Sequence, residues 1–448
     1  MRYIHHNGES SCIHSAIAME TLLARFPAFR NSDYRRLFVA VSLSSGSVWA
    51  LILGRSWLVH ELTNSALAVG AVTFAGFIPF VVVGPFAGVV ADRVDRRRML
   101  MMTSVIGMAT VSVLAAVTVT NVVELWHVIL LAFIQGSGHA ASVPSSQALL
   151  ANIVRKQDLL NAVSVMSVAQ HGSRITGPLF GTALLTALGV SAVFMLAVLM
   201  IGLSLLATWT IRFRAASRLT TPAPPTASQS ALQQLRDGLN YTRNERRLAT
   251  VLVLVGFHCG LTMSFDSMMP TLATSIGGDS GTYGAITIAL GVGAIIGVLS
   301  LSILKQPRIQ GFAFLVAGLG SGLSMLAFGL ATTSTTAVIC ALFTGGTQGS
   351  YMALSQVFIQ EIVPDAYRGR ALSLFALVAA GVMAFAFLGY GWLSEIIGIR
   401  PLLIFPGLLW VILFLIAGIR LDNVRHLLRV GSFGSSETQA TTTPPTTT

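Results

Sequence analysis

The chain contains twelve long stretches that are nearly free of charged residues. Each holds about 20 or more residues, and a helix of about 20 residues crosses the ~30 Å hydrocarbon core of a bilayer. Backbone N–H and C=O groups have no water partners in lipid, so each stretch is predicted to be a helix. The expected spans are 37–60, 66–91, 99–120, 125–150, 159–187, 190–211, 248–273, 283–304, 309–331, 335–360, 370–397 and 400–420.

The composition excludes a water-soluble domain as the main body of the protein. Only 10% of the residues are charged and 54% are hydrophobic, whereas soluble domains carry about 25% charged residues. The net charge of +11 does not indicate nucleic-acid binding, because the Arg residues lie in short loops between the apolar stretches. We therefore expect the lipid bilayer as a partner, and no nucleic acid.

The sequence contains no motif of a cofactor, metal or nucleotide site. The three cysteines, Cys12, Cys259 and Cys340, do not have the spacing of metal ligands. A GxxxxGK[ST] phosphate loop is absent, which disfavours an ATP-driven pump. Enzyme motifs are absent too, so we expect neither an enzyme nor a cofactor.

Basic residues alternate between the loops. Lys and Arg occur before the first stretch and after every even-numbered one, whereas five of the six intervening loops contain none. Arg400 is the only exception. The positive-inside rule then places both termini in the cytoplasm. Lys occurs only at Lys156 and Lys305, a bias typical of GC-rich bacteria, so we expect a multi-pass protein of a bacterial inner membrane.

Residues 212–247 interrupt the apolar pattern and divide the chain. The part rich in Pro, Thr and Ala is expected to be a flexible linker, and 231–247 an amphipathic helix at the cytoplasmic surface. The predicted division is a cytoplasmic N-terminal tail 1–35, a six-helix bundle 36–211, the linker 212–247, a second bundle 248–420 and a disordered cytoplasmic tail 421–448.

The two halves resemble each other at an offset of 209 residues. Gly136 matches Gly345, and the spacing holds without gaps as far as Gly172 and Gly381. Beyond that point we expect the register to fail, since Gly181 falls opposite Tyr390. Chance identity in a Gly- and Ala-rich chain is the alternative. A parallel repeat of two six-helix halves is a known transporter plan, with its binding site near the midplane between the halves.

Residues 88–98 read Gly-Val-Val-Ala-Asp-Arg-Val-Asp-Arg-Arg-Arg. This segment resembles the loop 2–3 signature of the major facilitator superfamily. Asp95 stands where many members have Gly, as in the branch of macrolide and enterobactin exporters. Segments 57–65 and 363–370 resemble the same branch, and the resemblance runs from about 27 to 420. It implies an all-α membrane protein with twelve transmembrane helices in two pseudo-symmetric six-helix bundles, working as a monomer by alternating access.

The loop 2–3 segment also has a physical interpretation. A carboxylate at the end of helix two can face the N-terminus of a helix in the other half, whose dipole favours negative charge. Such contacts would latch the cytoplasmic gate in the outward-open state. The alternative is a topology anchor under the positive-inside rule. The predicted gating residues are Gly88, Asp92, Arg93, Asp95, Arg96 and Arg97.

Ionisable residues inside a membrane are costly and are candidates for function. Asp266 lies in helix seven, and we predict that it carries the transported proton. The alternative is a permanent structural pair with Arg55 of helix one or Arg174 of helix five. Since Arg stays protonated, neither Arg is expected to carry protons itself.

Helix five contains the sequence Gly177-Pro178-Leu-Phe-Gly181. It resembles the Gly-Pro motif of antiporters in the same superfamily, which implies export. Glycines allow close contact between helices, and Pro178 is expected to kink its helix.

Aromatic and Met side chains near the midplane are predicted to form an adaptable apolar cavity. Packing in the core or against lipid is the alternative for each of them. Gln135 lies where some drug antiporters of the superfamily have an Arg in helix four. The predicted cavity residues are Trp49, Phe77, Gln135, Met263 and Phe265.

Together these features predict a secondary active transporter that exports small molecules such as drugs, a siderophore or a metabolite against inward proton flow. Its expected partners are the small-molecule substrate, protons and lipid. A proton-coupled importer and a non-transporting membrane scaffold or sensor are the alternatives.

Overall fold

The computed structural model describes residues 27–84, 94–212, 231–304 and 306–430. These residues form helices and no strand. Nine of the helical segments in this part of the chain are long and apolar enough to cross a membrane. Three more, one of 17 residues and two that are less apolar, occupy the remaining stretches expected to span, so the fold fits twelve spans.

The first half begins with a short 3-10 helix and contains six long helices. Its helices are the 3-10 helix Pro27–Arg30, α2 (Ser32–Thr63), α3 (Ala66–Val82), α5 (Arg96–Val119), α6 (Leu125–Ile153), the 3-10 turn Lys156–Asp158, α7 (Leu159–Leu188) and α8 (Val190–Trp209). Polar side chains begin several of these helices, because the first N–H groups of a helix lack partners within it. The side chain of Asn31, for example, accepts hydrogen bonds from the N–H groups of Asp33 and Tyr34.

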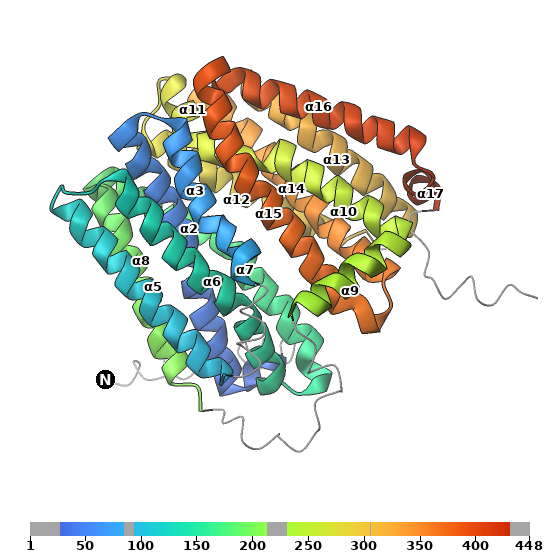
Figure 1. The fold of residues 1–448 in the computed structure, drawn as a ribbon, viewed down its shortest axis with the longest axis horizontal. Coiled ribbons are helices and arrows are strands. Elements are labelled where there is room, and N and C mark those ends of the chain that lie inside the picture. Colours follow the sequence, from blue (N-terminus) through green and yellow to red (C-terminus); the bar gives the residue numbers. More distant parts are fainter. Residues whose placement is uncertain (1–26, 85–93, 213–230, 305, 431–448) are drawn as a thin grey trace, which may run out of the picture.

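The second half begins with an amphipathic helix. Its helices are α9 (Ala231–Asn244), α10 (Arg246–His258), α11 (Met269–Ser275), α12 (Ser280–Leu301), α13 (Pro307–Gly329), α14 (Ser334–Ile362), α15 (Asp365–Ile397), α16 (Ile399–Arg420) and α17 (Asp422–Val430). Figure 1 shows the two halves as separate groups of helices, with α3 of the first group lying beside α15 of the second.

The internal repeat extends further than the matching residues indicated. Both ends of α6 and α14 lie 209 residues apart, and so do the starts of α8 and α16. Gly189 and Gly398 precede α8 and α16 with φ of 84° and 81°, a conformation that glycine adopts readily. The expectation that the register fails near Gly181 is therefore wrong. Side chains diverge there while the backbone keeps its spacing.

The halves pack closely at one end, where the loops carry no Lys or Arg except Arg400. We call it the Arg-poor end and the opposite one the Arg-rich end. At the Arg-poor end, the hydroxyl of Ser65 donates to Glu395 of α15. A Cβ atom at Gly70 would lie 2.5 Å from the carbonyl oxygen of Phe387. Trp57 stacks on Tyr283 with ring centroids 5.9 Å apart. These contacts close the Arg-poor end.

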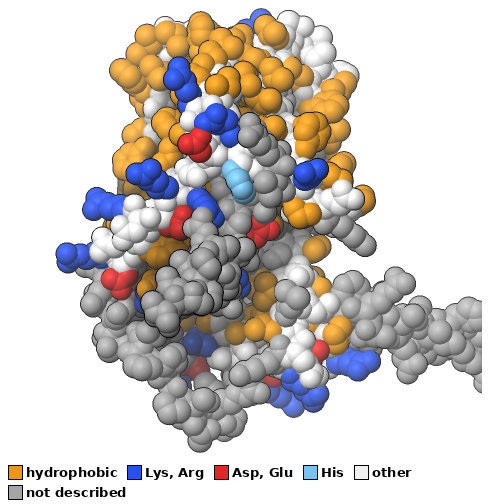
Figure 2. Space-filling model, turned by 90° about the vertical axis from the view of Figure 1, so that its right-hand side faces the viewer, with side chains coloured by type: hydrophobic (Ala, Val, Ile, Leu, Met, Phe, Trp, Pro, Cys, Tyr) orange, Lys and Arg blue, Asp and Glu red, His pale blue; other side chains and the backbone are white. Residues whose placement is uncertain are grey.

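The outer surface is apolar across the spans. Figure 2 shows orange apolar side chains over the upper part of one face, with most of the charged side chains lower down. Phe405 and Ile419 of α16 are more than half exposed, as expected for side chains that face lipid.

The ordered part of the chain extends into both of the tails predicted from the sequence. Residues 27–35 are already ordered, and Ala28 and Tyr34 are buried. The predicted disordered tail 421–448 begins with helix α17, because Val424 and Leu427, three residues apart on one face, are fully buried. Residues 1–26, 213–230 and 431–448 lie outside the described part of the chain.

Helix α9 packs on the Arg-rich end of α15. Tyr241 stacks on Tyr367 with ring centroids 4.6 Å apart, and Arg370 lies 4.0 Å from the carboxylate of Asp237. The amphipathic helix expected at 231–247 is thus formed over Ala231–Asn244, docked on the second half.

Candidate functional site

A cavity of about 60 Å³ lies between the two halves; we call it the central cavity. Residues of α2 and α7 line it on one side, and residues of the second half line it on the other. Its lining consists of Trp49, Ile52, Arg174, Asp266, Met269, Tyr283, Thr287, Leu290, Gly291, Ala294, Gly345, Gln348 and Gly349. The position fits the midplane site that a parallel-repeat transporter requires.

Asp266 reaches this cavity because the helix that carries it is irregular. After α10 the chain forms a π-helical turn over Cys259–Met263 and a 3-10 helix over Ser264–Met268 before α11 begins. Pro270 in the first turn of α11 has no N–H to donate. Irregular backbone at membrane depth is tolerated where it is buried in protein or lines a cavity.

Side chains satisfy the carbonyl groups that the irregular turns set free. The hydroxyl of Ser264 donates to the carbonyl of Cys259 at 2.8 Å. The amide of Gln348 donates to the carbonyl of Thr262, and Thr262 itself donates to the carbonyl of His258 at 2.8 Å. The break in the helix is therefore a supported structure, since freed backbone groups in a membrane need such partners.

Asp266 and Arg174 face the same cavity from opposite halves and interact electrostatically. No carboxylate–guanidinium contact within 4.0 Å joins these two described residues. Arg174 instead places its guanidinium carbon 4.4 Å from the ring centroid of Trp49, a cation–π contact. Arg55 does not line the cavity; it is buried along α2, and its Nε donates to the carbonyl of Leu51 at 3.2 Å.

The Gly-Pro motif presses α7 against α2. A Cβ atom at Gly177 would lie 2.5 Å from the carbonyl oxygen of Gly46, and one at Gly181 would lie 3.0 Å from Leu53. Pro178 is buried within the same helix. The motif therefore fixes α7 so that Arg174, one turn earlier, meets Trp49.

Glycine also brings α12 of the second half against α7. A Cβ atom at Gly291 would lie 2.7 Å from the carbonyl oxygen of Arg174. Close backbone approach of this kind is what small residues allow between membrane helices. The site is therefore held between two tight helix crossings.

The loop 2–3 motif is described only in part. Gly88, Asp92 and Arg93 lie outside the described residues. Asp95 accepts a hydrogen bond from the N–H of Arg98 and so begins α5.

The two described arginines of the gating motif bind helix ends in their own half. Arg96 donates to the carbonyl of Ala148 in α6 at 3.1 Å, and Arg97 donates to the carbonyl of Thr208 in α8 at 3.3 Å. Both arginines thus donate to carbonyls near helix C-termini, where the helix dipole attracts positive charge. The latch itself stays a prediction.

Four of the five predicted cavity residues divide into three groups. Trp49 lines the central cavity. Phe77 packs at the crossing of α3 and α15, 5.3 Å from the ring of Phe387. Met263 and Phe265 were expected in the cavity, but Met263 packs against a hydrophobic cluster of the second half and Phe265 lies in one that spans both halves. The 3-10 turn is the reason, because it directs Asp266 to the cavity and its neighbour Phe265 to the core.

Sequence reasoning missed Tyr283 and Gln348. Tyr283 lines the central cavity and stacks on Trp57 of α2, so it links the halves there. Gln348 supports the broken helix, as described above. A polar side chain inside an apolar stretch was the available signal for Gln348.

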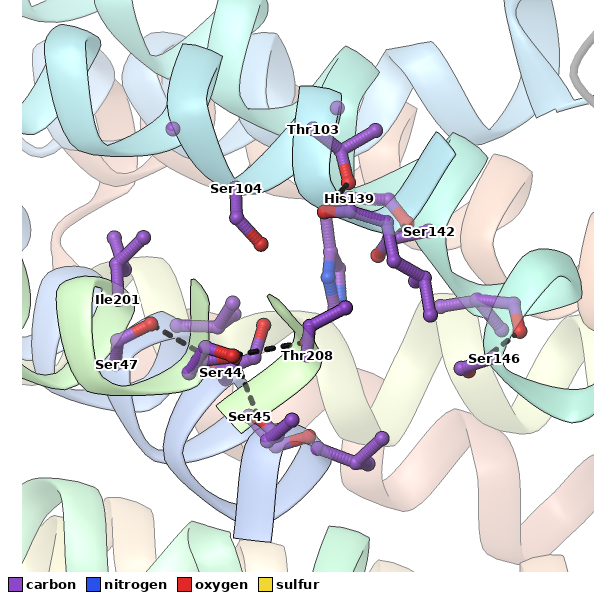
Figure 3. Close-up of a pocket in the computed structure, with 18 of the residues that line it drawn as sticks. Ser44, Ser45, Ser47, Thr103, Ser104, His139, Ser142, Ser146, Ile201 and Thr208 are labelled. Carbon is purple, nitrogen blue, oxygen red and sulfur yellow. Dashed lines mark hydrogen bonds between the residues drawn. The ribbon is translucent and has the colours of Figure 1, made fainter. Parts of the chain in front are cut away.

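A second cavity, of about 80 Å³, lies inside the first half between α2, α5, α6 and α8. Hydroxyl groups dominate its wall, and Gln135, another predicted cavity residue, lines it with His139 and Gln170. Figure 3 shows Ser44, Ser104 and His139 directed at the same space. We call it the serine cavity after Ser44, Ser45, Ser47, Thr103, Ser104, Ser142, Ser146, Ser204 and Thr208.

Two groups of six helices around a central cavity with a carboxylate and a guanidinium define a secondary transporter of the major facilitator fold. The sequence model of the family described as transmembrane secretion effector matches residues 23–433. The chain belongs to this family, within the major facilitator superfamily.

Characterised and uncharacterised bacterial transporters are similar to the chain along most of its length. An uncharacterised MFS-type transporter, YfiS of Bacillus subtilis, is 27% identical, over 87% of this chain and 94% of its own. Macrolide efflux protein A of Streptococcus pyogenes is 21% identical, over 87% and 95%. The enterobactin exporter EntS of Citrobacter koseri is 25% identical, over 79% and 82%.

Solved transporters share the fold at low identity. A bacterial homologue of the human lysosomal transporter Spinster, in an inward-facing and unoccupied conformation, matches with a TM-score of 0.70 at 13% identity, over 85% of this chain and 95% of that one. A D-xylose–proton symporter matches with a TM-score of 0.68 at 16% identity, over 86% and 96%.

Proposed function

We propose that the protein exports small molecules across a bacterial inner membrane in exchange for protons, by alternating access and as a monomer. The family membership and the similarity to macrolide and enterobactin exporters support export of a drug or a siderophore-like metabolite. Under the positive-inside rule the Arg-rich end and both termini face the cytoplasm.

One observation carries the proton coupling. Among the described residues that line the two cavities, Asp266 is the only acidic one, and it shares the central cavity with Arg174 of the other half. An ionised Asp266 compensates the charge of Arg174, and protonation removes that compensation. Loading a proton therefore changes the electrostatic balance across the interface that must rearrange during transport.

The closed Arg-poor end supports cytoplasmic loading of substrate. Ser65 and Glu395 join the halves there, and both nitrogens of the His60 ring lie within 3.5 Å of Thr271 or Thr274 hydroxyls. With that end facing outward, a substrate enters the central cavity from the cytoplasm. In the outward-open state, a proton from outside then binds Asp266, and the transporter returns to the state that is open to the cytoplasm.

The test is uptake of ethidium into energised inverted vesicles. We expect the wild type to accumulate the dye, an uncoupler to abolish the uptake, and Asp266→Asn to lose it. Asp279→Asn is the matched control, because Asp279 lies at the start of α12, outside the cavities, and Asn keeps the cap. Full uptake by Asp266→Asn would make this residue structural.

The same vesicles separate the alternatives. A proton-coupled importer would deplete the dye from the vesicle interior when the membrane is energised. A scaffold or sensor would show no flux in either direction, with or without the substitution.

A further inference from the structure

The serine cavity lies in the part of the first half that is nearest the Arg-rich end. Its wall extends along α2 from Leu37 to Val48, and Thr208 of its wall is one residue from the end of α8. Gly107 lies eleven residues into α5, about 16 Å along the helix at 1.5 Å per residue. The cavity therefore reaches from the Arg-rich end to about mid-membrane.

Six polar side chains on this wall have no hydrogen-bond partner within the described part of the chain. They are Ser44, Ser45, Ser104, Gln135, His139 and Gln170. Other hydroxyls there donate to helix carbonyls, as Ser142 does to His139 at 2.9 Å and Ser204 does to Ala40 at 2.8 Å. Their oxygens still offer lone pairs to the cavity.

Water is the ligand that such a wall binds. Buried polar groups in proteins find partners, and a polar cavity with several donors and acceptors holds water. A volume of about 80 Å³ exceeds the ~10–15 Å³ that one water needs, so the cavity admits more than one water. Among the described residues that line the cavity there is no Asp, Glu, Lys or Arg, so none of them would trap a proton with a fixed charge.

The cavity ends next to the central cavity. Gln170 of its wall and Arg174 of the central cavity are one turn apart on the same face of α7. On α2, Val48 of the serine cavity precedes Trp49 of the central one. One helical turn therefore separates water in the serine cavity from the Asp266–Arg174 pair.

We propose that the serine cavity is a hydrated proton path between the Arg-rich end and Asp266, separate from the substrate route between the halves. The inference rests on the proposed proton exchange. On the way to the cytoplasm, His139 relays the proton: one ring nitrogen accepts H⁺ from a hydronium ion on the side of Asp266, and the other ring nitrogen gives its N–H proton to the next water toward the Arg-rich end. One proton moves, no bond to carbon changes, and the ring returns to neutrality.

Within the described part of the chain, few charged groups lie around His139. From α5, Arg96 and Arg97 lie at the Arg-rich mouth and are engaged with the carbonyls of Ala148 and Thr208. From α7, Arg174 lies beyond Gln170. The wall residues from α2, α6 and α8 carry no charge, and Phe80 of α3 packs edge-on against the His139 ring at 5.6 Å.

The first experiment tests hydration and needs no substrate. Ser104→Cys and Val105→Cys are labelled with a charged methanethiosulfonate reagent added at the Arg-rich side, and the wild-type rate is subtracted. Val105 is the matched control, since it is the next residue on α5 and is 49% exposed on the outer surface. We expect Ser104→Cys to react at least about tenfold faster, because the thiolate forms in water and not in lipid. Equal rates would overturn the proposal.

The second experiment plugs the cavity. A Cβ atom at Gly107 has no atom within 4 Å, so Gly107→Leu projects into open space, and Gly107→Ala is the control. We expect Gly107→Leu to slow labelling of Ser104→Cys and to abolish proton-driven ethidium uptake, while counterflow of ethidium without a proton gradient persists. We expect His139→Phe likewise to abolish proton-driven ethidium uptake while counterflow persists.

The outcomes separate this inference from the proposed function. Full proton-driven uptake by Gly107→Leu, with the wild type active, would overturn the proton path alone. A wild type without proton-driven uptake would overturn the proposed exchange and, with it, the role of the path.

Discussion

The two halves have the same arrangement of helices, but at equivalent positions the first half has a polar cavity and the second has packed aromatic side chains. Ser142 and Tyr351 are 209 residues apart, as are Ile201 and Trp410, in helices whose starts have the same spacing. The first member of each pair lines the serine cavity, and the second is buried in an aromatic cluster. The first half is therefore hollow and polar where the second is filled.

The aromatic cluster consists of His258, Phe314, Tyr351, Trp410 and Phe414. Tyr351 stacks on His258 and Phe314, with ring centroids 4.2 Å and 4.7 Å away, and Trp410 meets Tyr351 edge-on at 5.6 Å. The comparison indicates that the two halves have different roles. A packed second half supports the broken helix of Asp266, and the first half gives water access to the neighbourhood of that carboxylate.

The largest expected effect comes from replacing Trp410 of the second half by isoleucine, the residue at the equivalent position 201 of the first half. Trp410→Ile removes ring contacts and the hydrogen bond from its Nε1 to the carbonyl of Gly318 at 2.7 Å. We expect it to lower the free energy of unfolding by about 3 kcal/mol, measured by denaturant titration in detergent. Ile412→Ala, on the lipid-facing side of the same helix, is the control and should cost little. Equal losses would mean that the cluster does not stabilise this half.

A second pair of substitutions tests whether the halves share their helix contacts. A Cβ atom at Gly136 would collide with the carbonyl oxygen of Gly76, and one at Gly345 with that of Leu290. We expect Gly136→Ala and Gly345→Ala to lower the free energy of unfolding by similar amounts, about 2 kcal/mol each. Gly107→Ala, which meets no atom within 4 Å, should be neutral or slightly stabilising. A large loss in one half only would break the equivalence.

The reverse substitution tests the comparison in the first half, because it replaces Ser142 by the tyrosine found at the equivalent position 351. Ser142→Tyr places the counterpart side chain in the serine cavity, where about 80 Å³ is open. We expect the free energy of unfolding to change by about 1 kcal/mol, because the ring fills space but covers unpartnered polar groups. Labelling of Ser104→Cys should fall to the rate of Val105→Cys, whereas Ser142→Ala should leave it fast. Fast labelling in Ser142→Tyr would place the water elsewhere.

The spans were predictable from the sequence, but the orientation of particular side chains was not. Hydropathy locates the spans, because every backbone polar group in lipid must be paired within a helix. Regular periodicity assumes a uniform helix, so it gave no means of seeing that a π-helical and a 3-10 turn direct Asp266 to the cavity and Phe265 to the core. The pairing of Arg174 with Trp49 depends likewise on how closely α7 approaches α2.

The serine cavity was beyond sequence reasoning for a different reason. Ser and Thr are common in membrane helices simply because they donate to carbonyls of the same helix, as Ser142 and Thr208 do here. Only the arrangement of four helices shows which hydroxyls share one space. Gln135 was noted as a cavity residue, but its cavity lies inside the first half instead of between the halves.

The smallest predicted effect concerns the caps of α3 and α12, which are equivalent helices. Ser65 accepts a hydrogen bond from the N–H of Ala68 at 3.1 Å, and Asp279 accepts one from the N–H of Thr282 at 3.0 Å. The Thr282 bond holds the pKa of Asp279 below its ordinary value of 3.8. The stability from this cap is therefore complete above pH 3.8 and is lost as the pH falls through the lowered pKa, whereas Ser65 does not titrate.

We accordingly expect acidification from neutral pH to about pH 3 to weaken the α12 cap alone, by less than about 1 kcal/mol for so exposed a group. Thermal unfolding of the wild type and Asp279→Asn at both pH values measures this, because Asn caps the helix at either pH. The other carboxylates titrate in both proteins, so the difference between the two losses isolates Asp279. Identical losses would show that the two caps respond alike to acid, and that the halves differ in their interiors but not at this helix start.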